Sequence, residues 1–166
     1  NHSILNATEN NYWGATIADK EQNGLLIKDN KVFGCKTNVT TVTIPSDITS
    51  IGDRAFWLCN SLYSITIPSS VTNIEAGALS GCPSLSRIIV ENGNPVYDSR
   101  NNCNAIVETA TNTLIAGCKN TIIPNTITTI GESAFWYCST LTSINIPSSV
   151  KKIGVRAFVF CPSLTS

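Results

Sequence analysis

Seven cysteines among 166 residues are the first side chains to consider for chemistry. They fall into three groups, namely one position of a repeated pattern, two similar segments and one isolated site: Cys59, Cys82, Cys138 and Cys161; Cys35 and Cys118; and Cys103. Stacked turns would bring neighbouring Cα atoms about 5 Å apart, within reach of a disulfide. However, strands that are parallel and in register point both Cβ atoms the same way. Because no Cys-x-x-Cys or Cys–His grouping is present, we expect free, buried thiols that pack as small hydrophobic groups, and no metal site.

The side chains needed for catalysis are sparse. A Ser–His–Asp arrangement needs a fixed histidine, and the single histidine is His2, close to the first residue. A glycosidase needs two carboxylates about 5–9 Å apart across a cleft, whereas Glu91, Asp98 and Glu108 lie in segments that nothing orients together. No phosphate-binding glycine-rich loop is present. We therefore predict that the chain is not an enzyme and uses no cofactor.

Large aromatic side chains are better candidates, for binding rather than catalysis. They lie between the repeated Phe and Cys positions or close by: Trp57, Tyr63, Trp136, Tyr137 and Phe160. Exposed aromatic residues commonly anchor proteins or sugars. The alternative is that they pack between adjacent turns, and the sequence leaves both interpretations open.

Two further surfaces are candidates for binding. One is a row of outward strand positions with neighbouring charges: Thr43, Thr66, Ile89, Ile122 and Asn145, with Arg87 and Glu91 beside them. We expect an inserted hairpin to cover its two apolar members, Ile89 and Ile122. The other is the loop 92–102, which includes Tyr97, Asp98 and Arg100, because long excursions from a repeat often carry the function.

The composition excludes several classes of partner. Eleven basic and eleven acidic residues give zero formal net charge, and charged residues make up only 13%. This balance argues against a role that depends on electrostatic attraction to nucleic acid or an anionic membrane. No apolar run approaches the roughly 18 residues of a membrane span. With 42% hydrophobic residues, we expect a folded domain with a core and no membrane insertion.

An internal repeat dominates the sequence. Ile44-Pro45 and Ile67-Pro68 are 23 residues apart, as are Ile123-Pro124 and Ile146-Pro147. Val90-Glu91 is a degenerate copy another 23 residues on. A unit this short cannot close its own core, so neighbouring units must stack into a solenoid.

The pattern within each unit predicts its local structure. Alternation at 65–67 and 144–146 indicates short strands with one buried face, which stack into a parallel sheet. A second extended stretch is expected at 49–51 and its equivalents. Segments 53–58 and 132–137 begin with an acidic residue, which suits a helix N-terminus, and are expected to form single helical turns.

A longer duplication surrounds the repeats. Segments 104–108 and 113–118 predict a β-hairpin, and a near-copy occupies 23–28 and 31–35, with the shared ending Gly-Cys-Lys. The predicted organisation is an N-terminal cap or linker followed by one repeat domain: 1–22, then 23–166, divided into a hairpin module 23–40, repeats 41–90, an insertion and hairpin module 91–120, and repeats 121–166. The last unit has no recognisable cap. This predicts either a piece of a longer protein or end-to-end self-association.

The repeats resemble a known family. ITIPSSVTNIEAGALSGCPSL and INIPSSVKKIGVRAFVFCPSL are similar to the BspA-like leucine-rich repeat, whose unit reads LxxIxIPxxVxxIGxxAFxxC. The resemblance implies an α/β solenoid, mostly β, that forms a right-handed leucine-rich repeat superhelix with a parallel sheet on one face and inserted β-hairpins. No catalytic residue belongs to the motif. Val90-Glu91, Leu79 and Ser80 depart from it, so the middle turn is expected to be irregular.

Members of this family are linked with the surfaces of host-associated bacteria and with adhesion. The resemblance therefore implies a secreted or cell-surface module that binds a host extracellular-matrix or cell-surface protein, or another microbe. Two alternatives remain, a glycan-binding module and a passive spacer within a larger surface protein.

Overall fold

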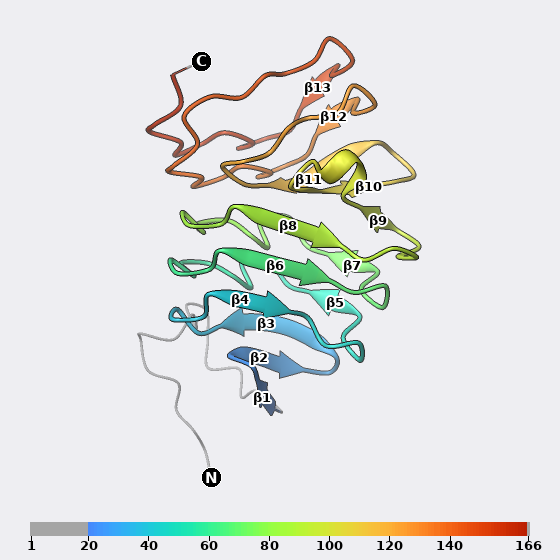
Figure 1. Cartoon of the computed structure of the whole chain (residues 1–166), viewed down its shortest axis with the longest axis vertical. Helices are drawn as coiled ribbons and strands as arrows, with labels where there is room; N and C mark the ends of the chain where they lie inside the picture. Colours follow the sequence, from blue (N-terminus) through green and yellow to red (C-terminus); the bar gives the residue numbers. More distant parts are fainter. Residues whose placement is uncertain (1–19, 166) are drawn as a thin grey trace.

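The computed structural model describes residues 20–165, which form a β-solenoid of about five turns. The turns stack along the long axis, with the N-terminal strands at one end and the C-terminal turns at the other (Figure 1). This confirms the predicted leucine-rich repeat solenoid. No helix within this range is long and apolar enough to cross a lipid bilayer.

Three parallel strands form one sheet on a face of the N-terminal half, which we call the flat sheet: β4 (Thr41–Thr43), β6 (Ser64–Ile67) and β8 (Arg87–Val90). The 23-residue register is visible in the pairing, because Val42 lies beside Ile65 and Ile65 beside Ile88. These inward side chains are buried. The residues between them point outward, as period-two alternation requires. Predicted strand 65–67 is therefore confirmed.

The other side of the solenoid carries two five-stranded sheets, whose strands correspond one to one in the same order along the chain. In chain order, the first contains β1 (Lys20–Gln22), β2 (Leu25–Lys28), β3 (Lys31–Cys35), β5 (Ser50–Ile51) and β7 (Asn73–Ile74). The second contains β9 (Tyr97–Asp98), β10 (Ala105–Glu108), β11 (Thr113–Gly117), β12 (Thr129–Ile130) and β13 (Lys152–Ile153).

The duplication predicted from the sequence extends to the hydrogen-bond register. Hairpin β2–β3 shifts register between Leu26 and Ile27, and hairpin β10–β11 shifts at the equivalent place, between Ile106 and Val107. The third strand of each hairpin module then pairs in parallel with the next repeat. Both predicted hairpins are therefore present. Of the predicted cap 1–22, only Lys20–Gln22 lie among the described residues, where they form β1.

The repeated apolar positions build the core between the two faces. In the inner turns, Ile44, Ile51 and Ile130 are buried. In the last turn, by contrast, Ile146 and Ile153 are 40% and 51% exposed, although they occupy the same repeat positions. The expectation of end-to-end association depends on this exposed end and stays a prediction.

The helical turns expected at 53–58 and 132–137 are wrong. These segments are successive tight turns, in which Ala55 N–H donates to the carbonyl of Gly52 and Trp57 N–H to that of Arg54. Arg54 has a left-handed φ of 52°, which interrupts a right-handed helix. Phe56 N–H bonds instead to the carbonyl of Ala78 in the neighbouring turn, at 3.0 Å. Pairing between turns therefore replaces pairing within a helix.

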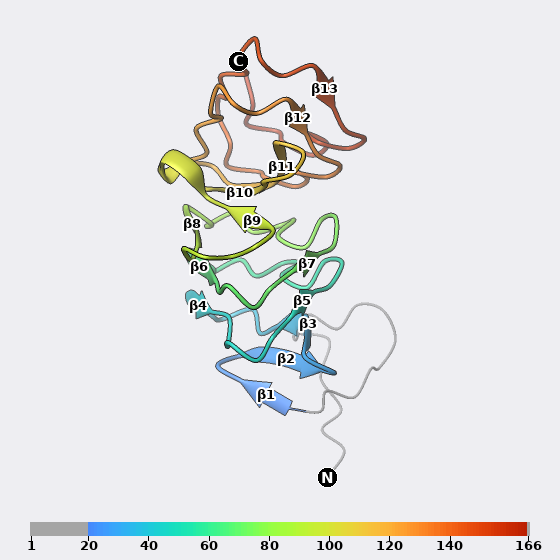
Figure 2. The same ribbon diagram turned by 90° about the vertical axis from the view of Figure 1, so that its right-hand side faces the viewer.

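The strand expected at 144–146 is also absent, because the flat sheet stops at β8. A short 3-10 turn, η1 (Arg100–Asn102), follows β9 and lies beyond β8, where the next strand of the sheet would be (Figures 1 and 2). The flanking Ser99 Oγ accepts a hydrogen bond from Val90 N–H, and the carbonyl of Cys103 accepts one from Ile122 N–H, each at 3.0 Å. The edge of β8 is therefore not available for pairing with 121–124, and 144–146 in turn has no neighbouring strand to pair with.

The inserted hairpin does not cover the apolar row as expected. Ile122 is 72% exposed, while Ile89 is half-buried. The physical reason is that β10 and β11 join the opposite sheet. The surface over the end of β8 is left open.

Candidate functional site

The interruption of the flat sheet creates a cavity of about 500 Å³, which we call the insertion cavity. Residues 89–94, 97–102 and Thr109 line it. It therefore joins two of the candidate surfaces, because Ile89 belongs to the strand row and Tyr97 and Arg100 to the loop. The aromatic residues expected to bind contribute nothing to its lining, apart from Tyr97.

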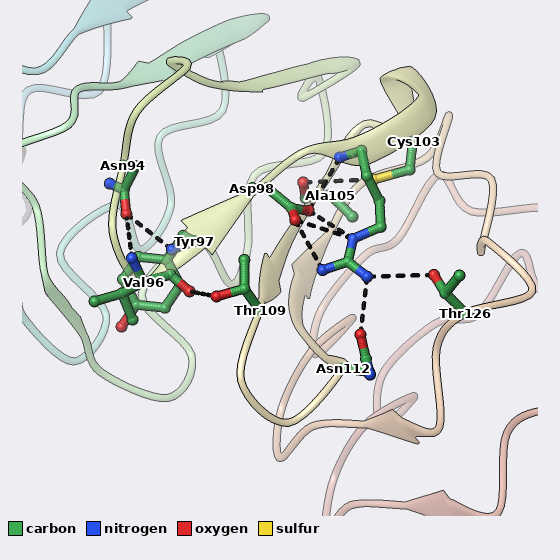
Figure 3. A network of polar contacts seen from close by, with 10 residues as sticks. Asn94, Val96, Tyr97, Asp98, Cys103, Ala105, Thr109, Asn112 and Thr126 are labelled. Atoms are coloured by element: carbon green, nitrogen blue, oxygen red, sulfur yellow. Dashed lines mark hydrogen bonds and ion pairs between the residues drawn. The ribbon is translucent and has the colours of Figure 1, made fainter.

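Asn94 anchors one wall of the insertion cavity. Its side-chain oxygen accepts hydrogen bonds from the backbone N–H groups of Val96 and Tyr97, at 2.9 and 2.8 Å (Figure 3). Its Nδ2 donates to the carbonyls of Pro68 and Val71 in the preceding turn, at 2.9 and 2.8 Å. The loop is therefore tied to the solenoid at its first bend.

Tyr97 is a positioning residue rather than an exposed contact. Its side chain is buried, and its hydroxyl accepts a hydrogen bond from Ile74 N–H at 3.0 Å. Burial raises the pKa of Tyr97, so the phenol stays neutral at ordinary pH. Tyr97 lies on β9, which pairs with β10. The sequence predicted β10 as a hairpin strand but did not reveal β9.

Arg100 fixes the opposite wall. Its Nε lies 2.9 and 3.0 Å from the two carboxylate oxygens of Asp98, and its Nη2 lies 2.8 Å from Asp98 Oδ2. Its Nη1 donates to Asn112 at 2.8 Å and to Thr126 at 3.4 Å, so one guanidinium links the loop, the hairpin and the next turn (Figure 3). Hydrogen bonding to Asp98 raises the pKa of Arg100, and the pair is electrically neutral.

Four polar side chains on the rim remain available to a ligand: Glu91, Asn92, Asn101 and Asn102. All four residues are exposed. Within residues 20–165, their side chains make no hydrogen bond or ion pair. The amides were not predicted individually, although the Asn-rich runs at 92–94 and 101–104 were a signal. The polar side chains that form the walls of the cavity are thus hydrogen-bonded within the fold, whereas these four side chains, which we call the free rim, are available to a ligand.

The remaining candidate residues of the strand row lie on both sides of the point where the flat sheet ends, at β8. Thr66 and Arg87 lie on β6 and β8 and share the outward face with Ile89. Asn145 is exposed but lies outside any strand, in the part beyond η1. The structure therefore brings Thr66, Arg87 and Ile89 together and separates Asn145 from them.

The aromatic residues form a stacked cluster along the tight turns. Ring centroids lie 5.2 Å apart for Trp57 and Trp136, 4.9 Å for Trp57 and Tyr137, and 4.5 Å for Tyr137 and Phe160. The guanidinium of Arg54 lies 4.7 Å from the Trp136 ring centroid, within cation–π range. Phe160 and Tyr63 are 58% and 57% exposed.

The two indoles meet because the turn between them carries small residues. Ser80 and Gly81 occupy the positions of Trp57 and Leu58 in the next unit, and Gly81 N–H donates to the carbonyl of Trp136 at 3.3 Å. Gly81 has a φ of +71°. This departure from the repeat pattern therefore has a structural role, since it makes room for aromatic packing across three turns.

Replacing Gly81 by alanine is expected to destabilise the chain more than replacing Gly93. Both glycines have positive φ, which strains alanine by about 1 kcal/mol. At Gly81 the new Cβ would also lie 3.0 Å from Trp57 Cε3, whereas at Gly93 it would meet nothing within 4 Å. Urea unfolding followed by tryptophan fluorescence should show a further loss of about 1 kcal/mol for Gly81→Ala. Equal losses for the two variants would contradict the role of Trp57 packing.

None of the seven cysteines forms a disulfide, and six are buried, including the isolated Cys103. Among residues 20–165, no three His, Cys, Asp or Glu side chains gather in a way that would hold a metal ion. His2 lies outside the described residues. The structure therefore places the thiols in the core rather than at a site.

Comparisons with known proteins are consistent with this architecture. Residues 27–165 match the BspA type leucine rich repeat region, in six copies. A leucine rich cell surface protein from Faecalibacterium prausnitzii is similar in structure, with 31% identity and a TM-score of 0.56 over 76% of this chain and 40% of that one. The pneumococcal vaccine antigen PcpA shares the fold, with 19% identity and a TM-score of 0.58 over 78% of this chain and 39% of its own.

The chain therefore spans about 40% of the length of the F. prausnitzii protein. No curated protein matches it. The match to the repeat model extends from β2 to the last described residue, and the turns, strands and core positions follow the same 23-residue register. The chain belongs to the BspA-type leucine-rich repeat family.

Proposed function

We propose that this chain is a non-enzymatic binding module that acts outside a bacterial cell and recognises a host or microbial macromolecule. The observation that carries the proposal is the insertion cavity, which opens where the repeats are interrupted. Ligand sites are typically pre-formed hollows of about 300–1,000 Å³ with a few polar groups. The insertion cavity is within this size range.

The recognition surface consists of the insertion cavity and the outward face of β4, β6 and β8. Thr43, Thr66 and Ile89 are paired neighbours across these strands, and Ile89 also lines the cavity. The regular strands hold this row rigidly, which lowers the entropic cost of binding. The surface is therefore continuous and preorganised.

The similarity to solved proteins supports the extracellular location. The F. prausnitzii protein is described as a cell surface protein and PcpA as a vaccine antigen. Seven cysteines without a disulfide do not conflict with export, because burial protects six of them and raises the pKa of Cys138 to about 12.

A solid-phase binding screen tests the proposal. The intact chain is compared on immobilised matrix proteins, mucins and a glycan array with Thr66→Glu/Ile89→Glu, which places two charges on the recognition surface. We expect saturable binding that falls at least tenfold in this variant. Thr49→Glu, which places one such charge at an exposed position outside the flat sheet, should bind normally.

Two outcomes would overturn the proposal. No binding to any probe would favour a passive spacer instead. Binding that survives Thr66→Glu/Ile89→Glu but is lost in Trp57→Ala/Trp136→Ala would move the recognition surface to the aromatic cluster. Circular dichroism and thermal unfolding verify that each variant is folded.

A further inference from the structure

We infer that the insertion cavity binds an uncharged sugar unit of a glycan, an inference that rests on the proposed binding function. The free rim of the cavity carries groups that suit sugar hydroxyls. Asn92, Asn101 and Asn102 present three amides, and Glu91 presents one carboxylate. Each amide offers two donors and one acceptor. Adjacent sugar hydroxyls both donate and accept, so they match this arrangement of groups.

The residues that line the cavity offer no unpaired positive charge. The one cation lining the cavity, Arg100, makes two bonds from Nε and one from Nη2 to Asp98, and its Nη1 is shared by Asn112 and Thr126. Glu91 adds an unpaired negative charge. A sialylated, sulfated or uronic sugar would therefore meet repulsion without a compensating partner. The charge pattern selects neutral sugars.

The backbone around the cavity is preorganised. Asn94, Asp98, Ser99 and Thr109 all have their side chains hydrogen-bonded within the fold. They hold in place the loop that carries the rim amides before any ligand arrives, so only the amide side chains themselves lose freedom on binding. Half-buried Ile89 supplies an apolar patch against which the C–H groups of a sugar ring can pack.

A protein ligand fits the insertion cavity less well. Protein interfaces place aromatic and Arg side chains at a desolvated centre. Here the aromatic residue, Tyr97, is buried and bonded to Ile74, and Arg100 is bonded to Asp98. The exposed large apolar residues, such as Tyr63 and Phe160, line other parts of the molecule.

An array of immobilised oligosaccharides tests this inference. It carries galactose-, mannose- and N-acetylglucosamine-terminated glycans, together with sialylated and sulfated forms. We expect the intact chain to bind at least one neutral glycan and to bind its sialylated or sulfated form at least tenfold more weakly. Calorimetric titration with the best neutral glycan then gives the affinity.

Three variants assign the binding to the rim. Asn101→Gly/Asn102→Gly removes two amides without backbone strain, because both residues have positive φ, 58° and 52°, which glycine adopts freely. We expect a loss of at least tenfold, roughly the worth of one or two hydrogen bonds. Asn30→Gly, the same change at φ 58° in the β2–β3 turn, should leave affinity unchanged. Glu91→Gln should narrow the preference for neutral over acidic glycans.

The outcomes separate this inference from the proposed function. Binding to a matrix protein that depends on Asn101 and Asn102, with no glycan bound, would overturn the sugar assignment and leave the binding module. A preference for acidic glycans, or neutral-glycan binding that the rim variants do not change, would also overturn it. No binding to proteins or glycans would overturn both.

Discussion

The folded chain is expected to lose several kcal/mol of stability when the pH rises from 8 to 10. The cause is the set of buried thiols. Desolvation is the main reason that the pKa is raised for four buried thiols and for one half-buried thiol: Cys82, Cys103, Cys118 and Cys138, and Cys161. For Cys138, the pKa rises from an ordinary value of 9.0 to about 12. Folding therefore keeps these groups protonated where the unfolded chain would ionise them.

The direction of the effect follows from proton release. Below about pH 8 the thiols are protonated in both states and do not affect the free energy of unfolding. Above 9.0 the unfolded chain loses protons that the folded chain retains, so stability falls, and for Cys138 it continues to fall up to about pH 12. Each such thiol costs about 1.4 kcal/mol per pH unit above its unfolded pKa. Cys82 and Cys138 together therefore cost about 3 kcal/mol at pH 10, a large part of the roughly 5–15 kcal/mol that stabilises a typical domain.

Urea unfolding at pH 7, 8, 9 and 10 with a reductant present measures this dependence. The matched control is Cys82→Ala/Cys138→Ala, which removes two of the affected thiols. We expect this variant to be less stable at pH 7, because each substitution leaves a small cavity, but to have a shallower slope above pH 9. A slope that is unchanged in the variant would mean that other groups cause the alkaline transition.

The repeat architecture was predictable because it depends on local, periodic information. Positions such as Ile44, Ile67 and Ile123 recur at fixed spacing, and a short amphipathic unit can bury them only by stacking. The near-identical endings of the two hairpin modules likewise predicted the duplication, and the shared register shift at Leu26 and Ile106 confirms it. The sequence did not indicate β1 and β9, which pair with these hairpins.

The errors arose where contacts between turns override local preference. An acidic residue before Ala-Phe suggests a helix start, but Phe56 N–H bonds to the carbonyl of Ala78, so a chain of tight turns is favoured. The flat sheet ends at β8 because Ser99 bonds to Val90 N–H, a contact that no periodic pattern reveals.

The candidate site was predictable as a region but not as an arrangement of side chains. The loop 92–102 was identified as a candidate because it is a long excursion from the repeat. The sequence did not show that Tyr97 and Arg100 would bond to the fold and leave the asparagines free. Likewise, Trp57 and Trp136 are far apart in the chain, and only the small residues Ser80 and Gly81 let them meet. Such assignments require the stacking order of the turns.

Replacing Phe135 by alanine is expected to lower the free energy of unfolding by about 3–5 kcal/mol, the usual cost of removing a buried phenylalanine. Its side chain is only 1% exposed. A Cβ added at Gly117 would lie 2.2 Å from Phe135 Cε1, so the ring fills the space above the β10–β11 hairpin. On its other side it stacks on Phe158, with centroids 5.1 Å apart and an angle of 7°.

Phe158 is the matched control, because it occupies the same repeat position in the last turn but is only half-buried. Phe158→Ala removes the same atoms and should cost roughly half as much, since less area leaves water at that end. Urea unfolding of both variants at pH 7 makes the comparison. Equal losses would mean that the last turn is as well packed as the inner ones, which would contradict the exposure of Ile146 and Ile153. A larger loss for Phe135→Ala would show that stability is concentrated where the hairpin module joins the repeats. The insertion cavity would then lie next to the most stable part of the solenoid, where its walls can stay rigid.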